Sequence, residues 1–412
     1  MLEFLNNPIV AAVIKSAILI VILLTVFAYM TLIERVVVAR IQGRIGPNRA
    51  GPLGLLQPVA DGIKMAFKEQ IVPNQAKKAI YVLAPTLSVV VAICAFAVVP
   101  LGNNWSGDPA KPSVWDPFIG DLNVGILWIL AISSLAVYGI VLGGWSSGNR
   151  YSLLGALRSA AQMVSYETSL GLALGGTIMW AGSLSMVNII HSQVSMGIWY
   201  IVAQPLGFFI YIIAGVAEVN RAPFDLPEAE QELTAGYLTE YSGLRWSIYQ
   251  MAEYINMMTV SSIAATFFLG GWSFFGLTDH IPGVSIVIYA IKVAFFLFCF
   301  IWLRATLPRI RYDRLMRFGW ETLLPLAVLN IVITAFCVAL NWPWWVSGIA
   351  GLAVVIGMFF ILRRQSILQG TRYVDTKNNK VLPTSVRLVK YEKPVPAIEP
   401  RDTSEQTEAV QV

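Results

Sequence analysis

The sequence predicts an all-α polytopic membrane protein, and two observations lead to that prediction. Of its 412 residues, 56% are hydrophobic and only 13% are charged, a composition whose apolar surface a soluble core of this length cannot cover. The apolar residues are also gathered in runs of about 20, the length of helix that crosses roughly 30 Å of hydrocarbon. We therefore expect lipid to surround part of this chain.

Nine such runs follow one another, and with short amphipathic cytoplasmic helices they make up a predicted membrane domain over residues 1–362. The first run has no signal-peptide cleavage site, so we expect it to be retained as a span. The fourth is the least apolar, because it contains Gln162, Ser165 and Glu167. The nine predicted transmembrane helices lie near residues 10–33, 79–100, 122–142, 160–181, 198–217, 251–270, 284–303, 322–341 and 344–362.

The lysines and arginines lie almost entirely in alternating loops. These loops and the tail hold 26 of the 29, whereas the opposite loops hold only Lys111. Because basic loops stay on the cytoplasmic side, the N-terminus is expected outside and the C-terminus in the cytoplasm. Residues 363–412 are polar and contain prolines, so they form a predicted cytoplasmic C-terminal tail that a partner would have to order.

The first cytoplasmic loop contains an amphipathic stretch from Leu53 to Lys68. At helical spacing its apolar residues share one stripe, and Asp61 and Lys64 lie off that stripe. Since the stretch is too short and too charged to span, we expect a helix that lies at the membrane interface.

The cysteines and histidines do not form a metal-binding pattern. Cys94, Cys299 and Cys337 each stand alone in an apolar segment, and the only histidines, His191 and His280, lie between the predicted spans. Zinc and iron–sulfur sites need several thiolates or imidazoles at close spacing. The sequence therefore predicts no metal, cluster or haem held by this chain alone.

Ionisable residues inside a predicted span are functional candidates, because each costs about 3 kcal/mol on insertion scales. Glu167 lies roughly 10 Å from the cytoplasmic end of its span at the helical rise, and we predict that it takes and releases protons as a buried acid. Glu34, Glu253 and Glu321 lie at inner ends of spans, where snorkelling to the interface is the alternative. Lys292, midway along the seventh span, either pairs with Glu167, carries protons itself or forms a structural ion pair.

The loop 218–250 is acidic although it faces the cytoplasm, and Arg221 is the only base among its first 26 residues. Glu228 and Glu232 fall one helical turn apart, where like charges repel. Crowded carboxylates share protons and can pass a proton along, so this acidic cytoplasmic loop is predicted to belong to a proton path; a solvated acidic loop is the alternative. Its carboxylates are Glu218, Asp225, Glu228, Glu230, Glu232 and Glu240.

Three long motifs carry a resemblance to a known family. They read ERVVVARIQGRIGPNRAGPLGLLQPVADGIKMAFKE over residues 34–69, GWSSGNRYSLLGALRSAAQMVSYE over 144–167 and AEVNRAPFDLPEAEQELTAGYLTEYSG from residue 217. In this order they resemble the quinone-site membrane subunits of respiratory complex I, the NADH-quinone oxidoreductase, known as the H subunit in bacteria and as subunit 1 in mitochondria. The resemblance covers most of residues 10–340.

This resemblance implies a tilted helix bundle with a cavity that opens to lipid and admits a quinone as substrate. It implies an enzyme only as a subunit of a complex, because neighbouring subunits would supply the FMN and the iron–sulfur clusters, with the terminal cluster in a peripheral subunit. Quinone reduction would be coupled to proton pumping. The expected surroundings are other complex I subunits, quinone and lipid in an energy-transducing membrane such as the bacterial inner membrane, with no nucleic acid.

The resemblance also implies two sets of site residues. Those matching the family's charged quinone cavity are Glu34, Arg35, Asp61 and Lys64. Those matching its proton path are Glu167, Glu218, Asp225, Glu228, Glu230, Glu232 and Glu253. The chain departs from many family members in its ninth predicted span and in the tail 363–412, whose role the resemblance does not give.

Two alternative functions remain open at this point. One is the homologous membrane subunit of an energy-converting hydrogenase-type complex, which co-purified partners would distinguish. The other is a stand-alone ion transporter, for which transport by the isolated chain in proteoliposomes would be the evidence. No acid lies in the outer half of any predicted span, so this chain alone lacks a carboxylate relay across the membrane, and a subunit is the favoured interpretation.

Overall fold

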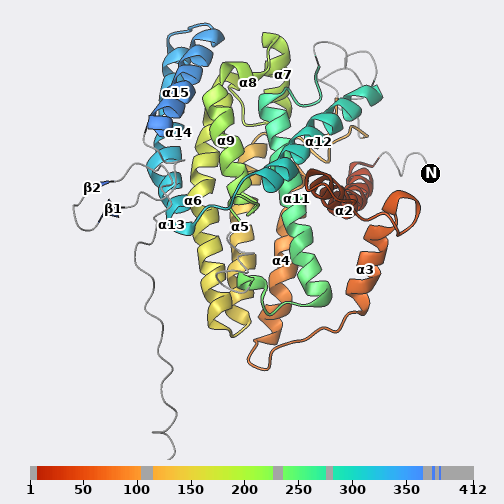
Figure 1. The fold of residues 1–412 in the computed structure, drawn as a ribbon. Helices are drawn as coiled ribbons and strands as arrows, with labels where there is room; N and C mark the ends of the chain where they lie inside the picture. The colour runs from red at the N-terminus through yellow and green to blue at the C-terminus, as the bar shows by residue number, and fades with distance from the viewer. Residues whose placement is uncertain are drawn as a thin grey trace, which may run out of the picture. The chain divides into compact units, whose positions relative to one another are not determined.

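The computed structural model describes residues 7–103, 115–225, 235–274 and 282–364, together with two short strands further on. The chain divides into two compact units, residues 1–356 and 357–412. All regular elements that are described in the first unit are helical, which confirms the all-α class (Figure 1).

The described elements are two short strands and a series of helices of unequal length. In the second unit β1 (Val374–Asp375) pairs antiparallel with β2 (Lys380–Val381). The helices are α2 (Pro8–Ile41), η1 (Pro52–Gly54), α3 (Gln57–Phe67), α4 (Lys78–Phe96), α5 (Gly125–Ser146), α6 (Arg150–Ala181), α7 (Met186–Met196), α8 (Tyr200–Ala203), α9 (Pro205–Glu218), η2 (Gly236–Leu238), α11 (Gly243–Phe268), α12 (Pro282–Thr306), α13 (Tyr312–Arg317), η3 (Phe318–Leu323), α14 (Leu324–Ala339) and α15 (Trp344–Arg364).

Capping residues set the ends of α6 and the start of α7. The side chain of Asn149 accepts a hydrogen bond from the Tyr151 N–H at 2.9 Å, which fixes the start of α6. Gly182 ends the helix in the left-handed conformation, with φ at 64°. Ser185 then accepts from the Asn188 N–H at 3.3 Å and starts α7, so that the two helices meet at a bend of 58°.

Helix α6 packs on α9 and α14, and α11 packs on α4 and α12 (Figure 1). Helix α5 is central to the first unit, because it packs between α4 and α6. Its glycines make this close packing possible. A Cβ on Gly139 would lie 2.1 Å from Ser88 Oγ, and one on Gly143 would lie 2.2 Å from the Tyr249 hydroxyl. Small residues at helix contacts are typical of membrane bundles.

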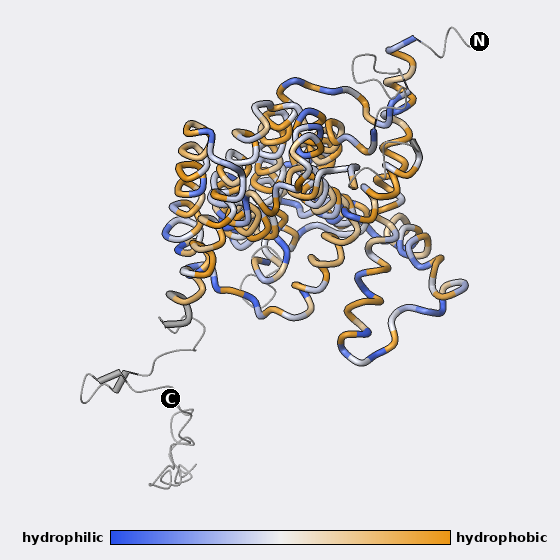
Figure 2. The backbone as a smooth tube through the Cα atoms, turned by 90° about the horizontal axis from the view of Figure 1, so that it is seen from above, coloured by the Kyte–Doolittle hydropathy of each residue, from blue (hydrophilic) through white to orange (hydrophobic). Residues whose placement is uncertain are grey.

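The described helices lie where the predicted runs do. Not all of them have the length and the hydropathy that a membrane span requires. Hydrophobic residues dominate the helices (Figure 2), and five of the described helices are long and apolar enough to cross a membrane. The bent pair of α6 and α7 makes a sixth if it counts as one span. The five are Pro8–Ile41, Lys78–Phe96, Gly125–Ser146, Gly283–Thr306 and Tyr312–Ala339.

Two of the remaining predicted spans fall short for identifiable reasons. The fifth is broken at Gln204, so that α9 has only 14 residues. Helix α11 carries Arg245, Gln250 and Glu253, which lower its hydropathy. The all-helical membrane architecture therefore agrees with the prediction, whereas the count of nine spans is not established by the helices themselves.

The amphipathic stretch of the first cytoplasmic loop is a helix, as predicted, but a shorter one. It is α3, which follows the 3-10 turn η1 and packs on α2 and α11. Val59, Ile63 and Phe67 lie on its exposed apolar stripe, and Phe67 is 87% exposed. The stripe thus faces away from the described part of the protein, as an interfacial helix would require.

Candidate functional site

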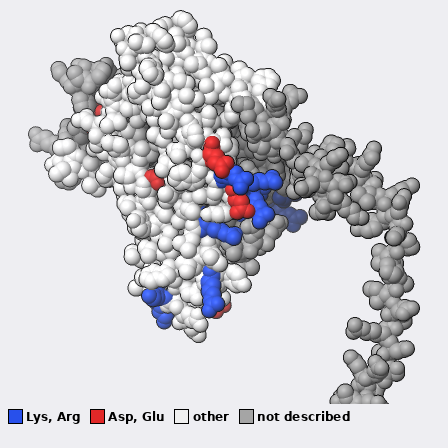
Figure 3. Space-filling model, turned by 90° about the vertical axis from the view of Figure 1, so that its left-hand side faces the viewer, with Lys and Arg blue, Asp and Glu red and all other residues white. Residues whose placement is uncertain are grey.

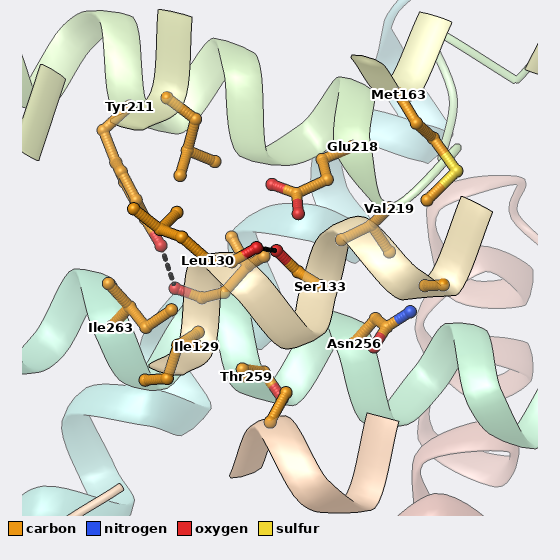
Figure 4. Close-up of a pocket in the computed structure, with 14 residues that line it drawn as sticks. Ile129, Leu130, Ser133, Met163, Tyr211, Glu218, Val219, Asn256, Thr259 and Ile263 are labelled. Carbon is orange, nitrogen blue, oxygen red and sulfur yellow. Dashed lines mark hydrogen bonds between the residues drawn. The ribbon is translucent and has the colours of Figure 1, made fainter. Parts of the chain in front are cut away.

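Two of the predicted proton-path acids each face a serine of α5. Glu167 sits in the second half of α6 and is partly buried, and the Ser134 hydroxyl of α5 donates a hydrogen bond to its Oε1. Glu218 is the last residue of α9, and its carboxyl group points toward Ser133 of α5 (Figure 4). Neither carboxylate has an ion-pair partner among the described residues. The two acids therefore meet hydroxyl groups rather than basic groups.

A small cavity adjoins Glu218. Its volume is about 30 Å³, and its polar lining comes from Glu218, Ser133, Tyr211, Asn256 and Thr259 (Figure 4). Tyr211 and Thr259 donate their hydroxyl protons to backbone carbonyls of α11, at 2.9 and 3.0 Å. The rest of the lining is apolar. A water molecule needs roughly 10–15 Å³ and two to four polar partners, so the cavity has room for one beside these polar groups.

Glu253 lies one turn before the cavity on α11. Its Oε1 accepts a hydrogen bond from the Tyr237 hydroxyl at 3.2 Å. Asn256, three residues further on, shares the same helical face and lines the cavity. The structure thus places three of the predicted proton-path acids, Glu167, Glu218 and Glu253, around the contact of α5, α6, α9 and α11.

The acidic loop is described only in part. Glu240 accepts a hydrogen bond from the Asn149 side chain at 2.7 Å, which ties the loop to the start of α6. Asp225 is partly buried at the loop's beginning. The remaining predicted acids of this loop, Glu228, Glu230 and Glu232, lie outside the described residues.

Glu34 belongs to a buried ionic cluster that joins four elements. The Arg221 guanidinium lies 3.4 Å from its Oε1, Arg304 of α12 contacts the same oxygen, and the Tyr254 hydroxyl of α11 donates to Oε2 at 2.6 Å. Glu34 and Arg221 are 6% and 5% exposed. The Arg221 guanidinium also stacks 4.3 Å from the centre of the Tyr254 ring, a cation–π contact.

The cluster holds a fixed positive charge next to the acidic loop. Burial would lower the pKa of Arg221, but Tyr254, Glu34 and Glu253 raise it above its ordinary value, so the guanidinium stays charged. Its Nε and Nη2 have no hydrogen-bond partner among the described residues. The sequence marked Arg221 only as the one base in the first part of the acidic loop, and no local pattern pointed to Arg304.

The other predicted cavity residues form a separate, more exposed group between α2 and α3. Arg35 lies 2.6 Å from Asp61 Oδ2, and Lys64 lies 3.3 Å from Asp61 Oδ1. Burial would raise the pKa of Asp61, but the Arg35 guanidinium and the Lys64 ammonium hold it below its usual value. Glu34 is adjacent to Arg35 in sequence, yet about 100° of helical rotation sends it into the buried cluster.

Lys292 does not pair with Glu167, and that alternative is wrong. Its Nζ donates to the carbonyl oxygens of Leu269, Gly271 and Ser273 at 2.6, 2.8 and 2.6 Å, and it lies 5.0 Å from the centre of the Trp199 ring. These three bonds use all three ammonium protons. Lys292 therefore binds the C-cap residue of α11, Leu269, and the segment that follows the helix.

Glu321 and the thiols lie apart from these groups. Glu321 is exposed, 3.8 Å from Arg317. The three cysteines are free thiols, and His191 lies on α7 with its ring centre 5.9 Å from that of Trp272; His280 is outside the described residues. Within the described ranges no three His, Cys, Asp or Glu side chains form a group that could hold a metal ion.

Comparison with known proteins gives consistent similarities. A family model described as NADH dehydrogenase matches residues 14–335. The H subunit of NADH-quinone oxidoreductase from Deinococcus deserti is 48% identical over 363 residues, which cover 85% of this chain and 91% of that protein. Subunit 8 of the Thermus thermophilus enzyme is 50% identical over 82% of this chain and 89% of its own length. The H subunit from Thermomicrobium roseum is 53% identical over 76% and 92%.

Proposed function

The chain belongs to the NADH dehydrogenase family, as a membrane subunit of NADH-quinone oxidoreductase, and from that premise we propose that it forms the quinone chamber and the cytoplasmic start of a proton path. The redox groups, FMN and iron–sulfur clusters, belong to partner subunits in this proposal, with the terminal cluster in a peripheral subunit next to the chamber. Quinone is the substrate, and this chain binds it and responds to its reduction.

The observation that supports the proton path best is the pair of carboxylates Glu167 and Glu218 beside α5. Each faces a serine hydroxyl and neither is neutralised by a basic side chain among the described residues. Two nearby carboxylates in a poorly solvated site titrate as a pair and share protons. Glu253 extends the set toward the acidic loop, in which Asp225, Glu228, Glu230 and Glu232 complete the proposed path.

The proposed quinone chamber lies on the side of the bundle formed by α2, α3 and the buried ionic cluster. Quinone carbonyl oxygens accept hydrogen bonds. The donors proposed for them are Nε and Nη2 of Arg221, which have no partner among the described residues. Glu34 holds this guanidinium in place, while Arg35, Asp61 and Lys64 join α2 to α3. A negative charge that forms on a reduced quinone would be attracted to this fixed positive charge.

We place the protein in the bacterial inner membrane with nine spans, its N-terminus outside and its C-terminus in the cytoplasm. Each of the nine predicted runs contains a described helix, with α8 and α9 counted together as one span. This correspondence supports nine spans. On the face drawn in Figure 3 the Lys and Arg side chains all lie in the lower half, as a single cytoplasmic side requires. Residues 363–412 dock onto a peripheral partner in this proposal, so their deletion should impair assembly; unchanged assembly and activity would contradict that docking.

The test of the proton path is Glu167→Gln in the assembled complex. It should severely reduce coupled quinone reduction and leave electron entry to artificial acceptors intact, because the variant keeps the shape of the side chain but cannot ionise. Glu321→Gln is the matched control, since Glu321 is exposed and its ion pair with Arg317 is long. Normal quinone reduction and pumping in Glu167→Gln would show that this carboxylate is not part of the path.

A further inference from the structure

Two adjacent serines of α5 each face one of the two carboxylates. Ser133 Oγ lies 3.0 Å from the Leu130 carbonyl oxygen, and Ser134 Oγ lies 2.9 Å from the same oxygen. Ser134 also contacts Glu167 Oε1, and Ser133 faces Glu218 at the cavity (Figure 4). Each serine thus has one carboxylate of its own, and both share one carbonyl.

The shared carbonyl has too few lone pairs for all of its donors. A carbonyl oxygen accepts two hydrogen bonds, and the helical N–H of Ser134, four residues on, takes one of them. One position is left for two hydroxyls, each of which has a single proton. When Ser133 donates to Leu130, Ser134 has to donate elsewhere, and the acceptor beside it is Glu167.

We propose that Ser133 and Ser134 form a hydrogen-bond switch that links proton uptake at Glu167 to proton release at Glu218. This inference rests on the proposed proton path. The two serines act as positioning residues, because they keep their own protons and only change the acceptor to which they donate.

The switch has two arrangements, which differ by the place of one proton. In the first, Glu167 is ionised and accepts from Ser134, Ser133 donates to Leu130, and Glu218 carries a proton. In the second, Glu167 has gained a proton and donates its O–H to Ser134 Oγ, so the Ser134 proton turns to the Leu130 carbonyl. Ser133 is displaced and donates to Glu218, which then favours the ionised form and releases its proton into the cavity. One proton enters at Glu167 and one leaves at Glu218.

A bond from a serine to a carbonyl three or four residues back is common in apolar helices, so this bond alone would not suggest a switch. Ser261 of α11 makes such a bond to Met257 at 2.8 Å and is fully buried. Ser134 differs from it because it has a carboxylate as a second acceptor, and Ser133 differs because it lines the cavity of Glu218. Ser261 therefore provides a matched control.

The test compares Ser133→Ala, Ser134→Ala and the control Ser261→Ala in the complete complex. The first two should slow coupled quinone reduction by about tenfold, the factor expected when one hydrogen bond to a charged group is lost, and Ser261→Ala should behave like the wild type. Ser134→Thr restores the hydroxyl and should restore the rate. Ser134→Cys keeps the approximate size of the side chain but has a weaker donor, so its rate should lie between those of Ser134→Ala and the wild type. It serves as the test variant if Ser134→Ala assembles poorly.

Infrared difference spectra taken on quinone reduction give a readout that a structural role would not change. In the wild type the carboxyl signal of Glu167 should rise as that of Glu218 falls, with bands assigned through Glu167→Gln and Glu218→Gln. When the spectra are recorded over a series of pH values, the two carboxyl signals should change at separate pH values in either serine variant. Wild-type pH profiles and linked signals in both serine variants, with Glu167→Gln inactive, would overturn the switch and leave the proton path standing. An active Glu167→Gln would overturn both.

Discussion

Glu34 and Arg35 are neighbours in sequence with opposite surroundings, so their replacement tests the buried ionic cluster directly. Glu34→Ala removes a carboxylate that faces both Arg221 and Arg304 and also accepts from Tyr254. Arg35→Ala removes half of a pair with Asp61 whose arginine side chain is 50% exposed. Both changes truncate a charged side chain on the same turn of α2.

The expected costs differ severalfold. Removal of one partner from a buried ion pair costs about 3–5 kcal/mol, because it leaves the other charge buried and uncompensated. Arg304 is partly exposed, and Arg221 keeps its contact with the Tyr254 ring and the attraction of Glu253. The lower end, about 3 kcal/mol, therefore applies to Glu34→Ala. An exposed pair is worth about 0–1 kcal/mol, which sets the expectation for Arg35→Ala.

The assay is the free energy of unfolding of each variant chain in mixed micelles, followed by titration with a denaturing detergent. The double variant Glu34→Ala/Arg221→Met should cost less than the sum of the single changes, because it also removes the uncompensated charge. If Glu34→Ala costs no more than Arg35→Ala, or if the double variant costs the full sum, the cluster does not stabilise the fold as argued.

Three further expectations follow from single contacts. The pKa of Asp61 is held low, so its pairs stabilise the protein above about pH 4 and that contribution is lost as the pH falls through the lower folded-state value; Asp61→Asn should flatten the acidic limb of a stability–pH curve, and an unchanged limb would contradict the ion pairs. Lys292→Ala leaves three backbone carbonyls without their donor, which should cost about 3 kcal/mol; added methylammonium should restore part of the melting temperature in Lys292→Ala but not in Lys292→Met. Gly143→Ala would set a methyl group 2.2 Å from the Tyr249 hydroxyl and should cost about 1–3 kcal/mol, whereas Gly62→Ala on α3 meets nothing within 4 Å and should gain up to about 1 kcal/mol; thermal melting of the two variants checks the contrast.

The sequence predicted the helices well, because long apolar runs determine them locally. Its count of spans was less secure, and the break at Gln204 shows why. Pro205 has no N–H to donate and begins a new helix there, yet the apolar run continues across the break, so hydropathy alone cannot reveal it. The amphipathic α3 was predictable because its charges and its apolar stripe separate cleanly at helical spacing.

The site was predictable in its acids and not in their partners. Glu167 could be found because a carboxylate inside a span is costly. The cluster around Glu34 joins residues as far apart as 34 and 304, and no local pattern brings Arg304 or Tyr254 to that carboxylate. Ser133 and Ser134 stand side by side in the third run and are visible in the sequence. Because serines are common in membrane helices, only the position of Glu167 in the structure shows that these two matter.

The partners of the acids separate two kinds of site within this one bundle. Glu34 is surrounded by two guanidinium groups and a tyrosine hydroxyl, and such partners keep a carboxylate ionised. Glu167 and Glu218 face serines, whose hydroxyl can donate to a carboxylate or to a carbonyl and can also accept from a protonated acid. A proton path needs groups whose charge changes easily, whereas a quinone chamber needs a charge that stays in place while its ligand is reduced. The sorting of basic partners to Glu34 and hydroxyl partners to Glu167 and Glu218 fits that division, and it is the reason why we place the chamber at the ionic cluster and the start of the proton path at α5.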